Sequence, residues 1–273
     1  MGNSIITNPG VFTALRNLNT VNRKAESIQN QVSTGLRVTG AVDDASNFAI
    51  AQGVRGEIKA YMAVNQGLRA ALGVVKVGIA AATAVSEILT DMRAKSVAGR
   101  NAGLTDQQRT IIADDFIQLR DQFDSLVSDA VFNGKNLIDL ASSPLTVLSN
   151  IEGGTLTVGN YRLRAVNLQF GSADANLRTL ANAEAADRYV VEALQTVGEA
   201  LGGLGASARV IESQIVFNEA LMDATEEGLG NIVDADMGRS AALLTAVQVR
   251  QELSVQTLGI ASQQPQALLG LFS

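Results

Sequence analysis

Both ends of the chain carry apolar residues that recur every three or four positions, and this pattern limits what the chain can fold into. Near the N-terminus the repeated positions are Val11, Leu15, Leu18, Val21, Ala25, Ile28 and Val32. Near the C-terminus they are Met237, Ala241, Leu244, Val247, Gln251, Val255, Leu258 and Ala261. A period near 3.5 predicts two helices that each bury one face against another helix. Because an isolated amphipathic helix is only marginally stable in water, each end needs a partner.

These predicted terminal helices are poor in charge. From Gln251 onward the only charged side chain is Glu252. The N-terminal helix carries uncharged amides away from its apolar positions, at Asn17, Asn19, Asn22, Gln29, Asn30 and Gln31. A solvated helix normally carries charges on its outer face, whereas amides can pack against another chain without the cost of burying a charge. A polar surface face is the alternative. We expect the two ends to pair with each other and with copies of themselves.

Capping signals and periodicity predict three helices in the first half of the chain. The first begins at Asn8-Pro9, since proline suits the first helical turn, and ends at Gly35. A second follows a break and covers residues 45–98. After a turn at 99–104, a third covers 105–130 and opens with Thr105-Asp-Gln-Gln, which fits a capping box.

The pattern changes in the middle of the chain and then returns to helix. Alternating residues predict strands at 145–148, 155–158 and 161–165, with a tight turn at Gly159-Asn160. Helices are then predicted at 183–201, at 206–228 after a break at Gly202-Gly203, and at 235–271.

These elements predict a mainly α fold, a long antiparallel helical bundle or coiled coil with paired N- and C-terminal helices and a small central β-hairpin region. The expected parts are a coiled-coil domain of the two paired ends made of residues 1–40 and 234–273, a helical rod domain made of 41–140 and 176–233, and a small β-rich part of the rod at 141–175.

Composition removes much of enzyme chemistry. The chain has no His and no Cys, so it offers no imidazole base, no thiolate nucleophile and no zinc site built on either side chain. An enzyme that uses carboxylates stays an alternative, and the pairs Asp43/Asp44, Asp114/Asp115 and Asp234/Asp236 could hold a cation. Helix capping and salt bridges explain such residues more simply. We expect no catalysis, no cofactor and no metal.

Charge and hydropathy also bear on the partners. The net charge is −6 with a pI near 4.8, and no stripe of Lys and Arg occurs, which argues against nucleic acid as a partner. The N-terminus lacks the basic and apolar regions of a secretory signal peptide. The longest apolar stretch, 72–85, is short and contains Lys76, so we expect no insertion into a membrane.

Short motifs at both ends carry a resemblance to a known family. They are Ile6-Thr7-Asn8, Leu15, Asn17-Leu18-Asn19, Ser33-Thr34-Gly35-Leu36-Arg37, Asp43-Asp44-Ala45, Ala49-Ile50-Ala51, Phe132-Asn133-Gly134, Ile232-Val233-Asp234-Ala235-Asp236-Met237, Gln248, Gln263-Gln264-Pro265-Gln266, Leu268, Leu269 and Leu271-Phe272. With these residues the chain resembles bacterial flagellin over roughly residues 1–140 and 180–273. Its short middle resembles the compact flagellins of alphaproteobacteria.

The resemblance implies a structural subunit that polymerises into the flagellar filament for swimming and has no catalytic role. It implies export through the flagellar type III apparatus with the help of an export chaperone, and an extracellular place in the filament. The partners implied are further flagellin copies, the filament cap and the hook–filament junction proteins. It also implies that the terminal helices form the inner tube of the filament, that the helical body forms the surrounding shell, and that the β region faces outward.

One departure from the family concerns a patch on the helical body that an innate immune receptor of animals binds. Many flagellins carry an Arg and a Leu at the positions that align with Asp91 and Lys95, while Arg93 and Asp115 keep the family character. Because the Arg is replaced by the opposite charge, the resemblance implies weak or absent recognition by that receptor.

Two further alternatives belong to other functional classes. A hook–filament junction protein shares related terminal helices, but Gln263-Gln-Pro-Gln266 and Val42-Asp-Asp-Ala45 favour flagellin. An intracellular coiled-coil adaptor would carry Glu and Lys beside its apolar seams, and these ends lack them.

Overall fold

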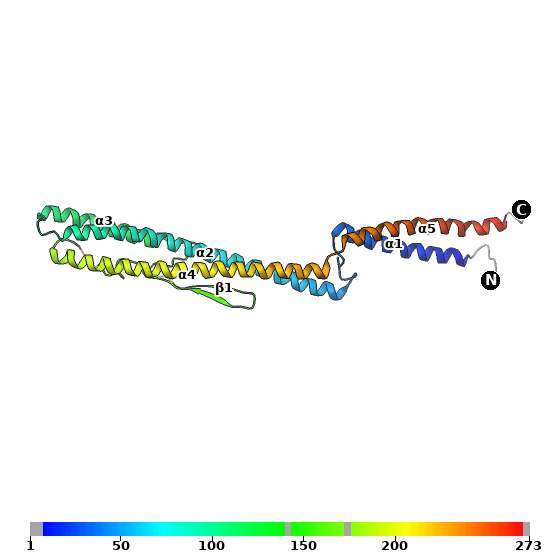
Figure 1. Ribbon diagram of the computed structural model, residues 1–273, viewed down its shortest axis with the longest axis horizontal. Coiled ribbons are helices and arrows are strands. Elements are labelled where there is room, and N and C mark those ends of the chain that lie inside the picture. The colour runs from blue at the N-terminus through cyan, green and yellow to red at the C-terminus, as the bar shows by residue number, and fades with distance from the viewer. Residues whose placement is uncertain (1–7, 140–142, 172–175, 270–273) are drawn as a thin grey trace. The chain divides into compact units, whose positions relative to one another are not determined.

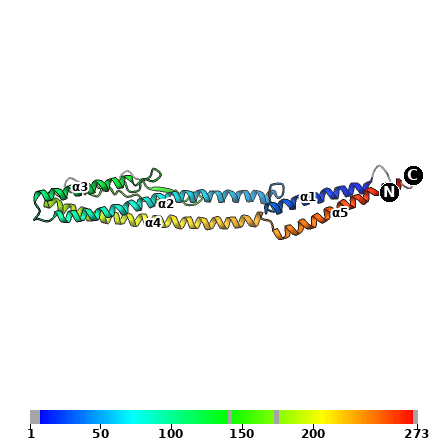
Figure 2. The ribbon, with the colours of Figure 1, turned by 90° about the horizontal axis from the view of Figure 1, so that it is seen from above.

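The computed structural model describes residues 8–139, 143–171 and 176–269 (Figures 1 and 2). The elements are α1 (Pro9–Thr34), α2 (Ala45–Gly99), α3 (Asp106–Asp129), β1 (Leu145–Leu148), β2 (Thr155–Val158), α4 (Leu180–Val233) and α5 (Met237–Leu269). The mainly α fold is confirmed, with a paired N-terminal and C-terminal helix and a small hairpin. The predicted end of the last helix at residue 271 lies outside the described residues.

The helix ends form where the capping residues predict them. The Asn8 side chain accepts hydrogen bonds from the backbone N–H groups of Gly10 and Val11, and Gly35 ends α1 in the left-handed conformation with φ of 73°. At the start of α3, the Thr105 and Gln108 side chains each accept a hydrogen bond from the other's backbone N–H. These local signals set the start and end of α1 and the start of α3, because they satisfy backbone groups that a helix end leaves unpaired.

The central hairpin differs in part from the prediction. Strands β1 and β2 pair antiparallel, with Leu145 opposite Val158, and residues 149–154 connect them. The third predicted strand, 161–165, and the predicted turn at Gly159-Asn160 are wrong. The backbone N–H groups of Tyr161 and Leu163 donate to the carbonyls of Leu137 and Ile138, at 2.7 and 2.9 Å. This segment therefore lies against the chain that follows α3 and does not extend the sheet.

Helix α4 is continuous, so the predicted break at Gly202-Gly203 is also wrong. Gly203 is explained by packing rather than by the end of a helix. A Cβ atom at this position would lie 1.7 Å from the Tyr161 hydroxyl oxygen, so only glycine lets the tyrosine ring lie directly on the helix.

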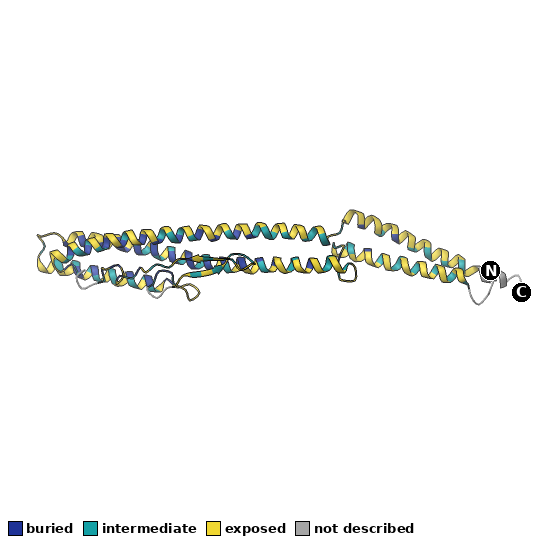
Figure 3. Ribbon diagram, turned by 90° about the horizontal axis from the view of Figure 1, so that it is seen from below, coloured by how far each residue is buried: buried dark blue, intermediate teal, exposed yellow. Residues whose placement is uncertain are grey.

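The chain divides into two compact units, Met1–Gly56 with Ala224–Ser273, and Glu57–Asp223. The second unit holds a large core formed by α2, α3, α4 and the segment 130–171. Its largest fully buried side chains include Phe116, Phe123 and Phe170, and the last two rings meet edge to face with centroids 5.0 Å apart. Figure 3 shows that buried residues concentrate in this unit.

The first unit contains much less buried apolar surface. Its one described cluster consists of Val38, Ala51 and Val233, with four partly buried residues packed around it. In α1 only Ile28 is buried, and the helices next to the N and C labels of Figure 3 are mostly exposed or intermediate. The predicted inner, rod and outer domain boundaries are not tested by this division and stay predictions.

One described helix, α2, has the length and apolar composition of a membrane-spanning segment. About two fifths (39%) of its most apolar window is buried inside the protein. Leu68, Val75 and Leu89 of α2 are fully buried in the core of the second unit. A core helix has the same composition for that reason, so this finding is weak evidence for a membrane span.

Candidate self-assembly surface

Helices α1 and α5 form an antiparallel pair. At one end, the Asn8 side-chain amide donates to the Ala261 carbonyl at 3.1 Å. At the other end, the Ala235 backbone N–H donates to the Gly35 carbonyl at 2.9 Å. Residues near the start of α1 therefore lie beside residues late in α5. The pairing of the two ends that the sequence predicts is confirmed.

The predicted seam residues lie between the two helices with four exceptions, of which Met237 and Ala241 are exposed near the start of α5. Buried or half-buried are Val11, Leu18, Val21, Ile28 and Val32 of α1, and Leu244, Val247 and Leu258 of α5. Leu15 and Val255 are 39% and 54% exposed. Ala14 and Ser254 are half-buried beside them. At these two places the seam uses a small neighbouring residue, which lets the helices approach closely.

The seam between α1 and α5 contains several polar side chains. In α5 it includes Ser240, which is buried, and Gln251 and Ser254, which are half-buried. In α1 the Asn22 side-chain oxygen is buried and has no hydrogen-bond partner among the described residues. Polar seam residues weaken a helix pair relative to an apolar seam, and an unpaired buried oxygen adds a further cost. The contact within one chain is therefore modest.

Helix α5 carries a second stripe on the face away from α1. Its members, Ala242, Ala246, Val249, Leu253, Gln256 and Ile260, are spaced 4, 3, 4, 3 and 4, and all are exposed. Val249, Leu253 and Ile260 are 50%, 55% and 69% exposed. We call these six residues the outer stripe. Sequence analysis missed it, although its spacing is the same 3.5-residue period that identified the first seam.

Residues 35–44, between α1 and α2, and 234–236, between α4 and α5, form a short connector that links the terminal helices to the rest of the first unit. The Val233 carbonyl accepts hydrogen bonds from the backbone N–H groups of Arg37 and Val38, at 2.7 and 3.3 Å. The Arg37 guanidinium also donates to the Ile232 carbonyl. Gly35 and its neighbour Leu36, which bridges to Asp234, complete this contact. The two chain segments that lead to α1 and α5 are thus held together by backbone hydrogen bonds.

The acidic motif residues of this connector cap turns and helices. The Asp43 carboxylate accepts from the backbone and hydroxyl of Thr39, and this hydroxyl contact is the main cause of its lowered pKa. Asp44 caps α2 by accepting from the Asn47 backbone N–H at 3.0 Å, which lowers its pKa. Asp236 caps α5 in the same way, accepting from Arg239 at 3.0 Å. Helix N-termini favour such carboxylates.

The Phe132-Asn133-Gly134 motif forms a tight turn in the second unit. Phe132 and Lys135 exchange two backbone hydrogen bonds of 2.9 Å, and Asn133 and Gly134 have positive φ of 51° and 71°. Positive φ at both central residues is the reason that Asn-Gly suits a turn of this type. The Phe132 ring packs against Gly73, where an added Cβ would lie 2.9 Å from a ring carbon.

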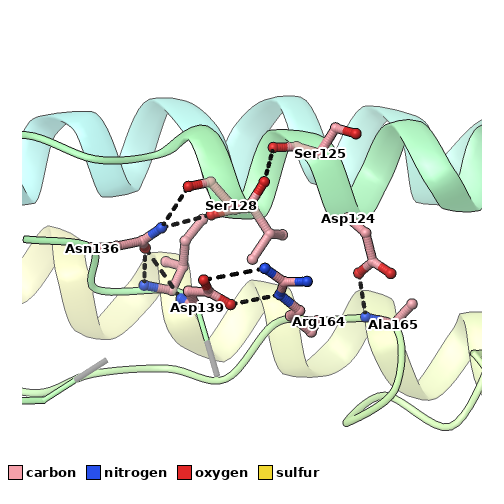
Figure 4. Close-up of polar contacts among 9 residues, drawn as sticks. Asp124, Ser125, Ser128, Asn136, Asp139, Arg164 and Ala165 are labelled. Carbon is pink, nitrogen blue, oxygen red and sulfur yellow. Dashed lines mark hydrogen bonds and ion pairs between the residues drawn. The ribbon is translucent and has the colours of Figure 1, made fainter. Parts of the chain in front are cut away.

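A polar network follows this turn and holds the next segment to α3 (Figure 4). The Asn136 amide donates to the Val127 carbonyl at 2.7 Å and so satisfies the end of α3. Arg164 makes two contacts with Asp139, at 2.6 and 3.3 Å, and these raise the pKa of the arginine. The Ala165 backbone N–H donates to Asp124 of α3 at 2.9 Å.

Asp91 and Lys95, the two positions that the sequence analysis assigned to the receptor patch, lie on the second unit. Asp91 is exposed, and the Lys95 ammonium lies 2.8 Å from the Asp115 carboxylate of α3. The structure thus pairs Lys95 with a residue that keeps the family character. Arg93 lies 4.0 Å from Asp187 of α4.

Five of the six acidic residues that sequence analysis named as cation candidates have other contacts. Asp43, Asp44 and Asp236 act as caps, Asp115 pairs with Lys95, and Asp114 lies 3.7 Å from Arg178. Within the described ranges, no group of three or more acidic residues is placed to hold a metal ion.

Comparison with known proteins gives full-length similarities. The family model described as "bacterial flagellin N-terminal helical region" matches residues 5–142, and the model described as "bacterial flagellin C-terminal helical region" matches residues 188–272. The chain is 32% identical to flagellin FljM of Caulobacter vibrioides over 99% of this chain and 98% of the relative. It is 34% identical to a flagellin of Brucella melitensis over 98% of this chain and 99% of the relative.

A solved structure shows the same fold at low identity. It is a Vibrio parahaemolyticus protein provisionally assigned as a flagellar hook-associated protein, with a TM-score of 0.61 and 15% identity. The similarity covers 70% of this chain and 100% of that one.

Proposed function

This chain belongs to the bacterial flagellin family and is a structural subunit of the flagellar filament, and we propose that it polymerises through helices α1 and α5. It is not an enzyme, and its place is the extracellular flagellum, where copies of the same chain surround it. The observation that carries the proposal is the outer stripe of α5, an exposed apolar seam on a helix whose other seam is already occupied by α1.

The energetics of the terminal pair support this assignment. Two helices joined by a seam with Ser240, Gln251 and Ser254 in it bury little apolar surface. Such a pair gains little stability in dilute solution, because helix formation in proteins depends mainly on packing. Val249, Leu253 and Ile260 gain burial only when another molecule covers them. Assembly therefore supplies the packing that the isolated chain lacks.

The charge distribution suits a crowded assembly. The outer stripe contains no charged residue, and Glu252 is the only charge after Arg250. Many copies of α5 can therefore approach one another without mutual repulsion. Contacts between different surfaces of successive copies give an open helical polymer when the rotation from copy to copy does not close a ring.

The remaining roles follow from the family. We propose the division that the sequence predicts, in which five segments form three regions. These are an inner coiled coil (1–40 and 234–273), a helical rod (41–140 and 176–233) and a β-rich outer region (141–175). We also propose export through the flagellar type III apparatus, an export chaperone that covers the apolar C-terminal segment before secretion, and contacts with the filament cap and hook–filament junction proteins. A junction role for the chain itself is disfavoured by its full-length match to flagellins, and the abundance of the chain in sheared filaments separates the two roles.

A single charge placed in the outer stripe tests the proposal. Leu253 is 55% exposed, so covering the exposed part contributes about 1–1.5 kcal/mol, or close to tenfold in affinity. We expect Leu253→Lys to raise the critical concentration for seeded elongation about tenfold or more, since the lysine also loses hydration. Gln248→Lys adds the same charge to an exposed position about 140° around the helix from Leu253, outside the stripe, and should elongate normally.

Removal of either terminal helix gives an independent test. We expect chains that lack residues 1–35 or 240–273 to stay monomeric while the second unit keeps its helices, as measured by sedimentation and circular dichroism. Normal elongation of Leu253→Lys would refute the role of the stripe, and polymerisation of both truncated chains would refute the role of the terminal helices.

A further inference from the structure

Three polar side chains are buried among the described residues of the second unit, and all three lie between α2 and α4. Asn65 and Asn218 are 5% and 1% exposed, and Ser96 is fully buried. Because a buried polar group costs free energy unless it finds a partner, Asn65 and Asn218 favour the one arrangement that pairs them, whereas the Ser96 hydroxyl also donates to the Arg93 carbonyl of its own helix at 2.8 Å. They belong to two clusters.

The first cluster, which we call the amide cluster, consists of Asn65, Gln214 and Asn218. The Asn218 amide donates to the Asn65 side-chain oxygen at 3.2 Å and to the Ser149 carbonyl at 3.0 Å. The Gln214 amide donates to the same Ser149 carbonyl at 3.1 Å and to the Asn218 oxygen at 3.0 Å. The cluster therefore joins α2 to α4 and also fixes the residue that follows strand β1.

The second cluster, which we call the Asp187 cluster, consists of Asp187 of α4, Ser96 of α2, and Arg100, which directly follows α2. Arg100 contacts Asp187 at 2.9 Å, and the Ser96 hydroxyl lies 3.3 Å from it. The Asp187 side chain is 16% exposed, so water screens these contacts only partly.

Both clusters specify the same alignment of the two helices. Asn65 and Ser96 are 31 residues apart on α2, and Asp187 and Asn218 are 31 residues apart on α4 (96 − 65 = 218 − 187 = 31). In an antiparallel pair, equal separations place both contacts in one register about 46 Å apart along the helices.

Most other contacts between α2 and α4 discriminate less between registers, with the exception of Gly78 of α2, whose Cβ position would lie 3.5 Å from a methyl carbon of Leu204 of α4. The exposed ion pairs Arg69–Glu219 and Lys76–Glu212 are seven residues apart on both helices. A shift of one heptad would place Lys76 opposite Glu219, and the acidic series continues at Glu226. Between Asp187 and Asn218 the buried core positions of α4 are all aliphatic, namely Val190, Ala193, Val197, Ala200, Leu204, Ala208, Ile211 and Ile215. Shifting such a row opposes aliphatic residues to aliphatic residues again.

We propose that the amide cluster and the Asp187 cluster are register-determining sites that hold α2 and α4 in one alignment, and that the amide cluster also docks the β1–β2 hairpin to it through Ser149. Buried polar residues in helix pairs specify register at a cost in stability. A heptad shift would move the helices by about 10 Å relative to each other. Copies that differ by that amount would not present the same surfaces, so a uniform register serves a repeating assembly. The packing of Phe132 on Gly73 and of Tyr161 on Gly203 attaches the 130–171 segment to each helix but does not join the helices directly.

The absence of cysteine allows a direct test by spin labels on the full-length monomer. Labels at Ala70→Cys and Glu199→Cys, both exposed positions, should report one distance of about 25 Å in the observed register. The Asn65→Leu/Asp187→Leu/Asn218→Leu variant removes both clusters with residues of similar size. We expect this variant to show a second population with a distance of about 35 Å between the labels, and a thermal unfolding midpoint equal to or above that of the parent protein.

The matched control is Lys76→Ala/Glu212→Ala, which removes an ion pair and should keep the single short distance. If the leucine variant loses its helicity, alanine at the same three positions takes its place. A single population near 25 Å in the folded variant would overturn the proposal, and so would a lowered midpoint without a second population. The measurement uses unpolymerised chain, so its outcome is independent of whether the terminal helices drive assembly.

Discussion

The neighbouring glycines of α4 allow a prediction in which two substitutions of the same kind have opposite signs. Replacing a glycine inside a helix by alanine gains about 1 kcal/mol from backbone entropy and helix propensity. No atom lies within 4 Å of the position where a Cβ at Gly202 would stand. We therefore expect Gly202→Ala to raise the free energy of unfolding by close to the full amount.

At Gly203 the added methyl group would overlap Tyr161. Its Cβ would lie 1.7 Å from the hydroxyl oxygen and 2.8 Å from the ring carbon that bears it, so the tyrosine must leave its site. Overpacking of this kind costs about 1–3 kcal/mol, which matches or exceeds the helical gain. We expect Gly203→Ala to lower the free energy of unfolding by about 0–2 kcal/mol, a difference of roughly 1–3 kcal/mol from Gly202→Ala.

Urea unfolding followed by circular dichroism measures both changes. A Tyr161→Ala background supplies the control, because without the ring Gly203→Ala should stabilise the protein as Gly202→Ala does. If Gly203→Ala stabilises the otherwise unchanged protein as much as Gly202→Ala, the packing explanation for the uninterrupted helix is wrong.

Three further predictions concern the connector, the Phe-Asn-Gly turn and the receptor patch. Hydrogen bonds lower the pKa values of Asp43 and Asp44 in the folded protein, so the stability they contribute is present above the unfolded-state pKa of about 3.9 and is lost as pH falls through the lowered values. In an acid titration followed by circular dichroism, replacing both residues by Asn should make the loss of stability below about pH 4 less steep. Gly134 has φ of 71° with open space around its Cβ position, so Gly134→Ala should cost about 1–2 kcal/mol in urea unfolding through backbone strain alone. Purified monomer should activate the innate immune receptor weakly or not at all in a cell reporter assay because of Asp91 and Lys95, and full activation would contradict this.

The parts of the fold that were predictable from sequence are those with local causes. The ends of α1 and α3 follow from Asn8, Gly35 and Thr105, whose side chains or conformations act on the nearest backbone groups. The β1–β2 strands follow from alternation. The segment 161–165 has a similar pattern, but its backbone donors bond to residues 137–138, a partner that no local signal reveals. A helix break was predicted at Gly203 for the same reason, because the side chain that packs on this glycine, Tyr161, is distant in sequence and no local signal reveals it.

The candidate surface was predictable in its position but not in its detail. Choosing the larger apolar residue at each step of the seam selected Leu15 and Val255, whereas the structure places Ala14 and Ser254 nearer the contact. A helix can satisfy a 3.5-residue repeat with either of two adjacent residues, and only the partner helix decides between them. The search for one seam also hid the second, although Val249, Leu253 and Ile260 are visible in the same spacing.

The central claim, that α1 and α5 gain their stability from neighbouring copies, is tested most directly by hydrogen exchange of the full-length chain before and after polymerisation. We predict that the amides of α1 and α5 exchange rapidly in dilute monomer and become strongly protected in the filament, while those of the buried core around Phe116 and Phe123 are protected in both. Equal protection of α1 and α5 in monomer and filament would contradict it.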